Sequence, residues 1–522
     1  MTTQVIVAGA GPVGLLTAAL LDAADVRVEV FERNEGPSKH SKATTMHPRT
    51  LEVLATVETV GGRRLAEVLV DHGTPVSSTH FAVLPDRLDY SGLDTPFPFV
   101  LLIAQADTER FLADHLRWRG VPVHYGQAVW GWEKTDSGLR VRVGDRARTA
   151  AYLVGADGAH SRVREQASIP FPGVPPTMVG FVADVELADP PLVARQVWHR
   201  DTGYVSAVPM QGGVWRLFGA EPADTGLTSE QVRQRQAMPL GLEELRATLR
   251  RVAATDFGLR AASWISRASD STRRAARYRS GRVLLAGDAA HVHLPAGGQG
   301  LNAGLQDAAN LAWKLAAEIH GWAPAQLIDG AFCYEHERRH VAEQLMANTL
   351  AQGVLMHTFT AGGKALRDLV SDLISRGGDT AEELAGWLSG LSLSYPQPEG
   401  THPLVGTRAP DLPLTDGGTL HQALRHDRYL LLDLTPDSGL AELGSAHIDV
   451  RAAPSPSGTW SALRAVLVRP DGYIAHATGS TDPLNLATTL AQWTTATGAI
   501  PTAAQELQLQ IVMFVVASAT SA

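Results

Sequence analysis

The fold is decided by one stretch near the N-terminus, Val5-Ile6-Val7-Ala8-Gly9-Ala10-Gly11-Pro12-Val13-Gly14. Its apolar start predicts a buried strand, and its G-x-G-x-x-G pattern predicts a tight turn that opens a helix. We expect Gly9 to permit the turn, Gly11 to let the backbone approach a pyrophosphate, and Gly14 to let the helix pack closely on the strand. A pyrophosphate would then lie at the helix N-terminus.

A second strand, Val28 to Phe31, completes this unit and is followed by Glu32 and Arg33. An acid about 20 residues beyond the glycines is where a dinucleotide-binding unit places its ribose-binding side chain. A glycine-rich turn without a ligand is the alternative. The strand, the helix and the distal acid together favour the dinucleotide site.

A second decisive stretch, Gly287-Asp288-Ala289-Ala290-His291, follows the apolar run Arg282 to Ala286. A carboxylate at Asp288 can accept hydrogen bonds from ribityl hydroxyls, while nearby backbone N–H groups face phosphate. The alternative role for Asp288 is a helix N-cap. The residues that come next favour the first role.

Those residues are Pro295-Ala296-Gly297-Gly298-Gln299-Gly300-Leu301-Asn302. Pro295, Gly298 and Gly300 would let the backbone approach a flat ligand. Leu301 and Asn302 open a helix whose positive end would stabilise a reduced flavin near its pyrimidine edge. The two motifs together indicate one dinucleotide that is bound at two places. Because the second motif is typical of a flavin site, the dinucleotide is expected to be FAD rather than a nicotinamide.

Composition excludes several other classes. The 522 residues carry 45 basic and 54 acidic side chains, a net charge of −9 with no basic tract, which argues against nucleic acid or an anionic membrane as a partner. Cys333 is the single cysteine, so internal disulfides, cysteine-based metal sites and dithiol redox pairs are excluded. No signal peptide is recognised, and no apolar run approaches the ~20 residues of a membrane span, so we expect a cytoplasmic protein. The oligomeric state stays open.

The order of the expected elements predicts an α/β protein. The expected parts are a discontinuous Rossmann-like FAD-binding domain (1–170 and 271–395, with 71–104 contributing partly to the substrate sheet), an inserted antiparallel-sheet substrate-binding domain (171–270), a small α/β unit (396–500) and a tail (501–522). The proline-rich stretch Pro396 to Pro413 would link the last unit to the rest.

Local patterns predict the individual elements. Helical spacing extends over Thr50 to Leu69, Glu230 to Val252 and about Leu301 to Glu318, and a strand-like run covers Thr79 to Leu84. The substrate sheet is expected to contain the strands Val179 to Leu187, Arg195 to Trp198, Tyr204 to Pro209 and Val214 to Glu221.

These motifs together resemble the single-component, FAD-dependent aromatic hydroxylases, the para-hydroxybenzoate hydroxylase class (group A flavoprotein monooxygenases). Within that class the chain is most similar to the aromatic-polyketide hydroxylases of antibiotic biosynthesis, of the angucycline and tetracycline types. The resemblance extends over nearly the whole chain. It is carried by Gly9 to Gly14, Ser41-Lys42-Ala43, His47-x-Arg49-Thr50-x-Glu52, Gln105 with Glu109, Asp157-Gly158, Gly287 to Asn302 and Val468 to Tyr473.

The resemblance implies a role for each matching residue. Glu32 would bind the adenosine ribose with Arg33 near the adenine, and Gln105 would contact the ribityl or isoalloxazine region. Lys42, where many relatives have arginine, would lie near the pyrophosphate or the flavin edge. The full cofactor set is Gly9, Gly11, Pro12, Gly14, Glu32, Arg33, Lys42, Gln105, Asp157, Asp288, Pro295, Gly298, Gly300, Leu301 and Asn302. A surface lysine, a helix cap at Gln105 and a plain turn at Asp157-Gly158 are the alternatives.

The same resemblance implies the chemistry. NADPH or NADH would transiently reduce a non-covalently bound FAD, O₂ would add to give the flavin C4a-hydroperoxide, and one oxygen atom would pass to a polycyclic aromatic, polyketide-type ring. The C-terminal unit would be a thioredoxin-like domain, and because it lacks cysteine its role would be structure or assembly. No protein base is visible.

The substrate would lie between the flavin and the mid-chain sheet. The candidate residues are Phe81, Trp198, Tyr204, Pro209, Phe218, Leu294 and Pro295, with His80, Arg195 and His199 as polar candidates. Ordinary core packing is the alternative for each apolar one. His291 and His293 are expected to be loop histidines rather than metal ligands, so no metal site is predicted.

Four other functions stay open. They are Baeyer–Villiger oxygenation of a polyketide ketone, oxidative inactivation of an antibiotic, a nicotinamide dehydrogenase that uses only the first glycine motif, and a flavin-binding module without activity.

Overall fold

The N-terminal glycine stretch lies at the carboxyl edge of a six-stranded sheet in this computed structural model, which describes residues 3–38, 41–193, 195–436, 439–454, 458–480 and 482–494. The chain is a mixed α/β protein. The strands of this sheet lie in the order β20 (Arg279–Ser280), β21 (Val283–Leu285), β12 (Tyr152–Gly155), β1 (Val5–Ala8), β2 (Val28–Phe31) and β8 (Val123–His124). All neighbours pair in parallel except β20 with β21.

The central strands are apolar because the sheet is covered on both faces. Val5 to Ala8 are all buried, and they pair with Val28–Phe31 on one side and Tyr152–Gly155 on the other. Helices α1 (Pro12–Ala23), α4 (Gln105–Arg119) and α8 (Gln299–Ile319) pack together on the sheet, and α10 (Tyr334–Met356) packs on α8. The three-stranded sheet of β11 (Arg146–Ala150), β10 (Gly138–Val143) and β9 (Val129–Thr135) contacts the six-stranded sheet through β10 and β12. Pro12 begins α1, where the fixed φ of proline suits the first helical turn.

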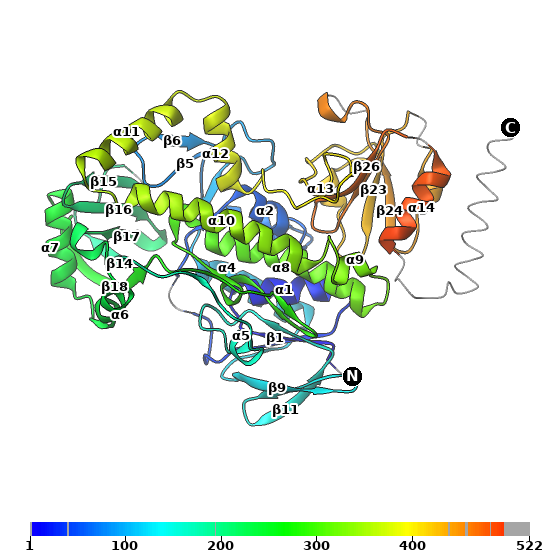
Figure 1. Ribbon diagram of the computed structural model, residues 1–522, viewed down its shortest axis with the longest axis horizontal. Helices are drawn as coiled ribbons and strands as arrows, with labels where there is room; N and C mark the ends of the chain where they lie inside the picture. Colours follow the sequence, from blue (N-terminus) through cyan, green and yellow to red (C-terminus); the bar gives the residue numbers. More distant parts are fainter. Residues whose placement is uncertain are drawn as a thin grey trace.

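A five-stranded antiparallel sheet lies at one end of the molecule, coloured green in Figure 1. Its strands lie in the order β15 (Gln196–Arg200), β16 (Gly203–Pro209), β17 (Val214–Ala220), β14 (Val179–Leu187) and β18 (Leu259–Ser269). Helices α6 (Ser229–Ala237) and α7 (Leu242–Ala253) pack against it. This sheet presents its other face to the FAD-binding region.

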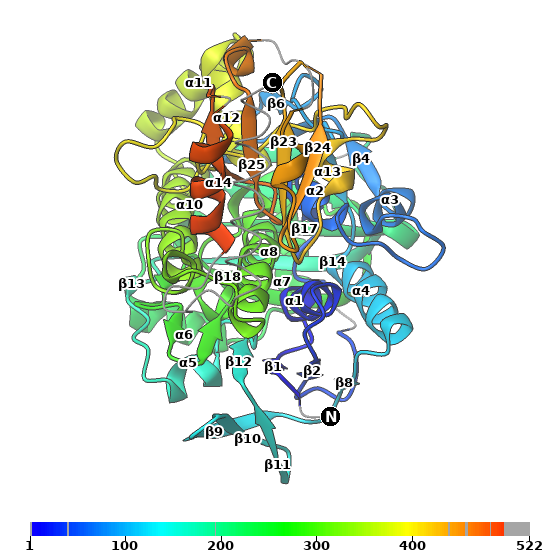
Figure 2. The same cartoon turned by 90° about the vertical axis from the view of Figure 1, so that its right-hand side faces the viewer.

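The C-terminal unit lies at the opposite end and faces the viewer in Figure 2. Its sheet has the order β24 (Ile448–Ala452), β23 (Tyr429–Asp433), β25 (Ala465–Val468) and β26 (Ile474–Thr478), with α13 (Leu420–Ala423) and α14 (Pro483–Thr494) beside it. Trp313 of α8 meets Tyr429 edge-on, with ring centroids 5.6 Å apart, so an aromatic cluster joins this unit to the FAD-binding region.

Buried ion pairs cross the same contact. Glu52 accepts from Arg408 through both carboxylate oxygens and from Arg49 Nη1 at 2.8 Å. Farther along, Arg469 donates to both oxygens of Glu337 at 2.6 and 2.9 Å. The C-terminal unit therefore shares a charged, buried interface with α2 (Pro48–Leu54) and α10.

The remaining elements are short or peripheral. They are β3 (Thr45–Met46), α3 (Leu65–His72), β4 (Thr74–Val76), β5 (Ser78–His80), β6 (Arg87–Asp89), β7 (Val100–Leu102), α5 (Arg162–Gln166), β13 (Gly173–Val174), β19 (Thr272–Arg274), β22 (His291–Val292), α9 (Ala325–Ile328), α11 (Ala361–Ser375) and α12 (Asp379–Ser389).

Four local expectations need correction. The helix expected over Thr50–Leu69 is two helices, α2 and α3, because the left-handed pair Gly61-Gly62 interrupts it. The helix expected over Glu230–Val252 also divides in two, on either side of Pro239. Other differences concern strands.

The strand expected over Thr79–Leu84 ends at His80, because Ala82 and Val83 have φ of +50°. The long strand β18 was not expected at all. The tail 501–522 lies outside the described residues. Within the part of the chain that is described, no helix has the length and apolar character needed to cross a membrane.

Candidate cofactor and substrate site

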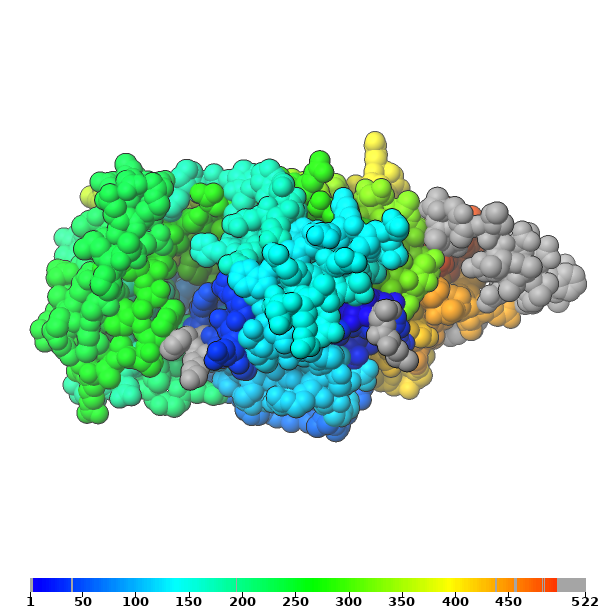
Figure 3. Space-filling view, turned by 90° about the horizontal axis from the view of Figure 1, so that it is seen from below, coloured from blue at the N-terminus to red at the C-terminus, as the bar shows by residue number. Residues whose placement is uncertain are grey.

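One cavity of about 910 Å³ extends from the glycine turn after β1, past Asp288, to the inner face of the five-stranded sheet. Ligand pockets reach about 1,000 Å³ at their upper end, so this cavity has the size of a large ligand pocket. In Figure 3, blue N-terminal residues lie between the green five-stranded-sheet region and the cyan region.

The three glycines of the first motif have different surroundings. Gly9 has φ +106°, and a Cβ there would lie 2.3 Å from the Ala156 carbonyl oxygen. A Cβ at Gly14 would lie 2.0 Å from the carbonyl oxygen of Gly9, so this glycine lets α1 approach the strand. Gly11 has no atom within 4 Å of its Cβ position and lines the cavity with Pro12. Gly14 does not line it.

Glu32 closes this end of the cavity. Its carboxylate accepts hydrogen bonds from the N–H groups of Ala10 and Asn34, both at 2.9 Å. These bonds fix the side chain at the glycine turn and leave further lone pairs for a ribose hydroxyl. Arg33 lines the cavity beside it.

Lys42 and Gln105 also line the cavity. Gln105 is the first residue of α4, and its amide accepts from Ala43 N at 3.2 Å and donates to Glu109 at 2.7 Å. Lys42 is exposed, and its carbonyl accepts from Arg216 Nη1 at 3.2 Å.

Asp157 lines the cavity but also acts as a helix cap. Its carboxylate accepts from Ser161 Oγ and from the N–H groups of Arg162 and Val163 at the start of α5. The sequence analysis gave a plain turn as the alternative here, and the capping contacts are a different structural role.

Asp288 is the unpartnered acid of the site. Among the described residues nothing donates a hydrogen bond to its carboxylate, which opens to the cavity while protein encloses the rest of the side chain. Burial raises its pKa, against opposing contributions from His291 and Lys42. The carboxylate is exposed to the cavity and its lone pairs are free, so it can accept a hydrogen bond from a ligand hydroxyl.

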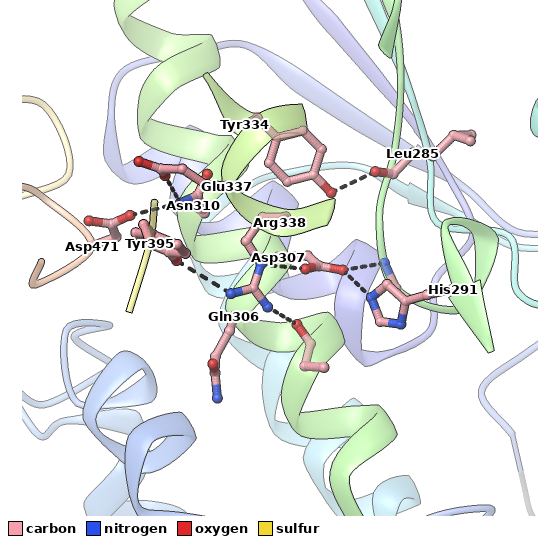
Figure 4. A network of polar contacts seen from close by, with 12 residues as sticks. Leu285, His291, Gln306, Asp307, Asn310, Tyr334, Glu337, Arg338, Tyr395 and Asp471 are labelled. Atoms are coloured by element: carbon pink, nitrogen blue, oxygen red, sulfur yellow. Dashed lines mark hydrogen bonds and ion pairs between the residues drawn. The ribbon is translucent and has the colours of Figure 1, made fainter. Parts of the chain in front are cut away.

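The backbone at Asp288 is held in place by Asp307, a residue that the sequence analysis missed. Asp307 accepts from Gly287 N at 3.0 Å, His291 Nε2 at 2.7 Å and Arg338 Nε at 2.6 Å (Figure 4). Burial alone would raise the pKa of this carboxyl, but Arg338 and His291 outweigh it and lower the pKa. Asp307 therefore stays ionised and anchors the turn that presents Asp288.

The second glycine stretch forms the turn before α8. Gly298 has φ +69°, and a Cβ there would lie 2.8 Å from the Thr45 side chain. Pro295, Gly300 and Leu301 line the cavity near the N-terminus of α8. The positive end of a long helix is thus directed at the cavity.

Asn302 does not line the cavity. Its amide accepts from His47 N at 2.8 Å and donates to Thr45 O at 2.9 Å and Gly298 O at 2.8 Å. All its contacts are with the protein, so the side chain connects the start of α8 to the segment after Lys42.

The substrate candidates divide into two groups. Tyr204, Phe218, Leu294 and Pro295 line the sheet end of the cavity. The second group, Phe81, Trp198 and Pro209, does not.

The direction of each side chain explains this division. Trp198 contacts Phe257 on the far face of the sheet, with ring centroids 5.0 Å apart, since alternate residues of a strand point to opposite faces. Phe81 is buried in the core under α11 and α12.

The polar candidates also divide. His80 and Arg195 line the cavity, whereas His199 lies outside it, bonded to Met356 O at 3.1 Å and stacked on Phe359. Burial lowers the pKa of His80 to about 4, so its ring is neutral at neutral pH.

Arg216 is a further side chain that the sequence analysis missed. It donates to both oxygens of Asp184 at 2.8 Å and to the carbonyl oxygens of Ser41 and Lys42. This buried ion pair fastens the Lys42 segment to the five-stranded sheet. A charged residue at a strand position that faces inward was the feature of the sequence that could have indicated this role for Arg216.

These residues fit FAD. The carboxylate of Glu32, the open space at Gly11, the unpartnered carboxylate of Asp288 and the N-terminus of α8 all line one cavity. They suit the adenosine ribose, the pyrophosphate, the ribityl chain and the flavin ring, respectively. No group of three or more possible metal ligands occurs in the described ranges.

The comparisons with known proteins agree with this geometry. Residues 2–349 match the FAD binding domain family and residues 402–497 match the aromatic-ring hydroxylase C-terminal family. The fold and the site thus define an FAD-binding aromatic-ring hydroxylase. The chain belongs to the flavin-dependent monooxygenase family that includes the aromatic-polyketide hydroxylases. The resemblance drawn from the motifs is confirmed.

Its relatives span several substrates. An uncharacterized aromatic compound monooxygenase of Bacillus subtilis is 38% identical over 501 residues, covering 92% of this chain and 96% of that one. A rifampicin monooxygenase of Streptomyces venezuelae is 37% identical over 499 residues, covering 94% and 98%. The solved structure of OxyS, the anhydrotetracycline hydroxylase of Streptomyces rimosus, aligns with a TM-score of 0.83 at 38% identity, covering 95% and 99%.

Proposed function

We propose that this chain is an FAD- and NAD(P)H-dependent monooxygenase that hydroxylates a polycyclic aromatic, polyketide-type substrate. One observation carries the proposal: the residues that fit FAD and an apolar, aromatic wall line the same cavity. A flat ligand against Tyr204 and Phe218 would therefore lie next to the flavin ring at the α8 N-terminus.

A non-covalently held FAD would supply the redox chemistry, with NADPH or NADH as the reductant and O₂ as the source of the transferred oxygen atom. The chain's own residues bind and orient. Asp288 accepts hydroxyl hydrogen bonds, and the N-terminus of α8 stabilises negative charge on the ring. The buried aromatic wall excludes water from the oxygen-transfer step.

The remaining assigned residues support the same arrangement. We propose that Glu32 and Arg33 hold the adenosine, that Lys42 lies near the pyrophosphate or the flavin edge, and that Gln105 lies near the ribityl chain. Pro295 would separate flavin from substrate. The C-terminal unit is proposed as a thioredoxin-like domain whose role is structural, since it contains no cysteine.

The test is a single-turnover reaction of the reduced enzyme with ¹⁸O₂ in the presence of polycyclic phenols, followed by mass spectrometry. The expected product is a ring-hydroxylated phenol carrying one ¹⁸O atom. A product without ¹⁸O would contradict oxygenation. A ring-expanded lactone with ¹⁸O would assign the enzyme to Baeyer–Villiger chemistry, and a modified antibiotic without activity would indicate inactivation.

A further inference from the structure

Arg195, at the sheet end of the cavity, has more hydrogen-bond donors than acceptors. Nη1 donates to Ser78 O and Nη2 to Thr79 Oγ1, both at 3.2 Å. Nε is buried and has no partner. A guanidinium offers five N–H donors, so three of them have no acceptor within the ranges that the structure describes.

Its charge is also uncompensated. Among the described residues no carboxylate forms an ion pair with Arg195. The neighbours that affect its charge are Arg87, another cation, and the buried phenol of Tyr90. Burial and Arg87 lower the pKa of Arg195 to about 10, so the side chain still carries its charge at neutral pH. An isolated buried cation is unfavourable, and a ligand that brings negative charge would relieve it.

The backbone of Arg195 is fixed in a conformation that arginine rarely adopts. Its φ is +59°, and its carbonyl oxygen accepts from His80 Nε2 at 3.0 Å and Arg87 Nη2 at 2.9 Å. Non-glycine residues in this region are strained and persist where surrounding bonds hold them, often at ligand sites. The guanidinium is therefore presented to the cavity in advance of any ligand.

Apolar and aromatic side chains also line the cavity at the end where Arg195 lies. Tyr204, Phe218, Leu294 and Met356 line the same end of the cavity, and His80 beside it is neutral. A ligand that matches this end has a broad apolar body and a single negative group.

We propose that Arg195 is an anion subsite that binds an ionised oxygen, a phenolate or enolate, on the ring system of the substrate. The inference rests on the proposed function, since it takes the sheet end of the cavity as the place of the aromatic substrate. A cation that stabilises the ionised oxygen favours the electron-rich form of the ring, which is the form that accepts an electrophilic oxygen atom. The substrate's own ionisation then replaces a protein base.

The experiment compares two probes of one shape on the FAD-loaded enzyme. Lawsone is a hydroxynaphthoquinone whose enol is ionised at neutral pH, and its methyl ether is neutral. Binding is measured by calorimetry without NADPH, on wild type, Arg195→Met and Arg195→Lys. Naphthoate, a carboxylate on the same two-ring frame, shows which kind of anion is preferred.

Arg367 supplies the matched control. It is a buried arginine whose pKa burial also lowers to about 10, but it donates to the carbonyl oxygens of Ala82, Val83 and Leu355 and does not line the cavity. Arg367→Met should weaken both probes together and leave their affinity ratio unchanged.

Wild type should bind lawsone about tenfold to a hundredfold more tightly than its ether, the range for a charge-assisted hydrogen bond. Arg195→Met should bring the ratio to about one, and Arg195→Lys should retain part of it. The inference is wrong if wild type binds lawsone and its ether with equal affinity, or binds neither. It is also wrong if Arg195→Met still binds lawsone more tightly than the ether, or if naphthoate is the only anion that wild type prefers. No turnover is involved, so failure to oxygenate a substrate would count against the proposed function alone.

Discussion

Replacing Glu52 with glutamine should loosen the contact between α2 and the C-terminal unit. Glu52 accepts from Arg49 and Arg408, and also from Thr95 Oγ1 at 2.7 Å. Burial alone would raise its pKa, but His421, Arg408 and Arg49 outweigh burial and lower the pKa from 4.5 to about 2.

The size of the effect follows from that shift. A fall from 4.5 to about 2 corresponds to about 3 kcal/mol of the free energy of unfolding at neutral pH. Removing one member of a buried ion pair gives a similar loss of about 3–5 kcal/mol. With a urea m-value of about 3 kcal/mol per molar, the unfolding midpoint should fall by about 1 M.

The assay is urea unfolding followed by tryptophan fluorescence, since Trp313 lies buried at the contact with Tyr429. Glu230→Gln is the matched control, because Glu230 also bonds an arginine, but on the surface. A depressed pKa in the folded state means that the stabilisation is complete above pH 4.5 and disappears as the pH falls toward 2. A midpoint unchanged at neutral pH, or a difference from wild type that persists at the low end of this range, would refute the reasoning.

Three further results are expected. Asp288→Ala should raise the Kd for FAD roughly tenfold to over a hundredfold in equilibrium dialysis, because a charge-assisted hydrogen bond is lost; unchanged occupancy would mean that Asp288 does not contact the cofactor. Asp307→Asn leaves Arg338 buried without its ion pair, so thermal stability should fall by about 3–5 kcal/mol and FAD should dissociate faster. The control is Asp449→Asn, which removes a partly exposed ion pair with Arg451. Equal rates of FAD release from the two variants would count against the role of Asp307 as an anchor of the Asp288 turn. Acid precipitation should leave FAD in the supernatant, whereas a yellow pellet would indicate a covalent flavin.

The parts of the fold that the sequence predicted depend on neighbours in the chain. Gly9 and Gly14 act on the turn and the helix that they themselves belong to. Val179–Leu187 alternates strongly enough to be recognised as a strand. β18 was missed because Leu259–Ser269 mixes small, charged and apolar residues without clear alternation. Its pairing with β14 decides its conformation.

The missing parts of the site depend on residues far apart in the chain. Asp307 and Arg338 lie on different helices, and Asp184 and Arg216 on different strands. Nothing local predicts either pair, although a carboxylate inside the apolar stretch of α8 was a signal that a partner exists. Phe81 and Trp198 were misplaced relative to the cavity because composition does not show which face of an element a residue occupies.

The single continuous cavity couples the two ligands that we assign to it. The flavin ring would form part of the wall that the aromatic ligand contacts. The ligand would therefore make all of its contacts only when FAD is bound. By thermodynamic linkage, the factor by which FAD increases the ligand's affinity equals the factor by which the ligand increases that of FAD. The fraction of holoenzyme would then rise with the concentration of substrate as well as with that of FAD.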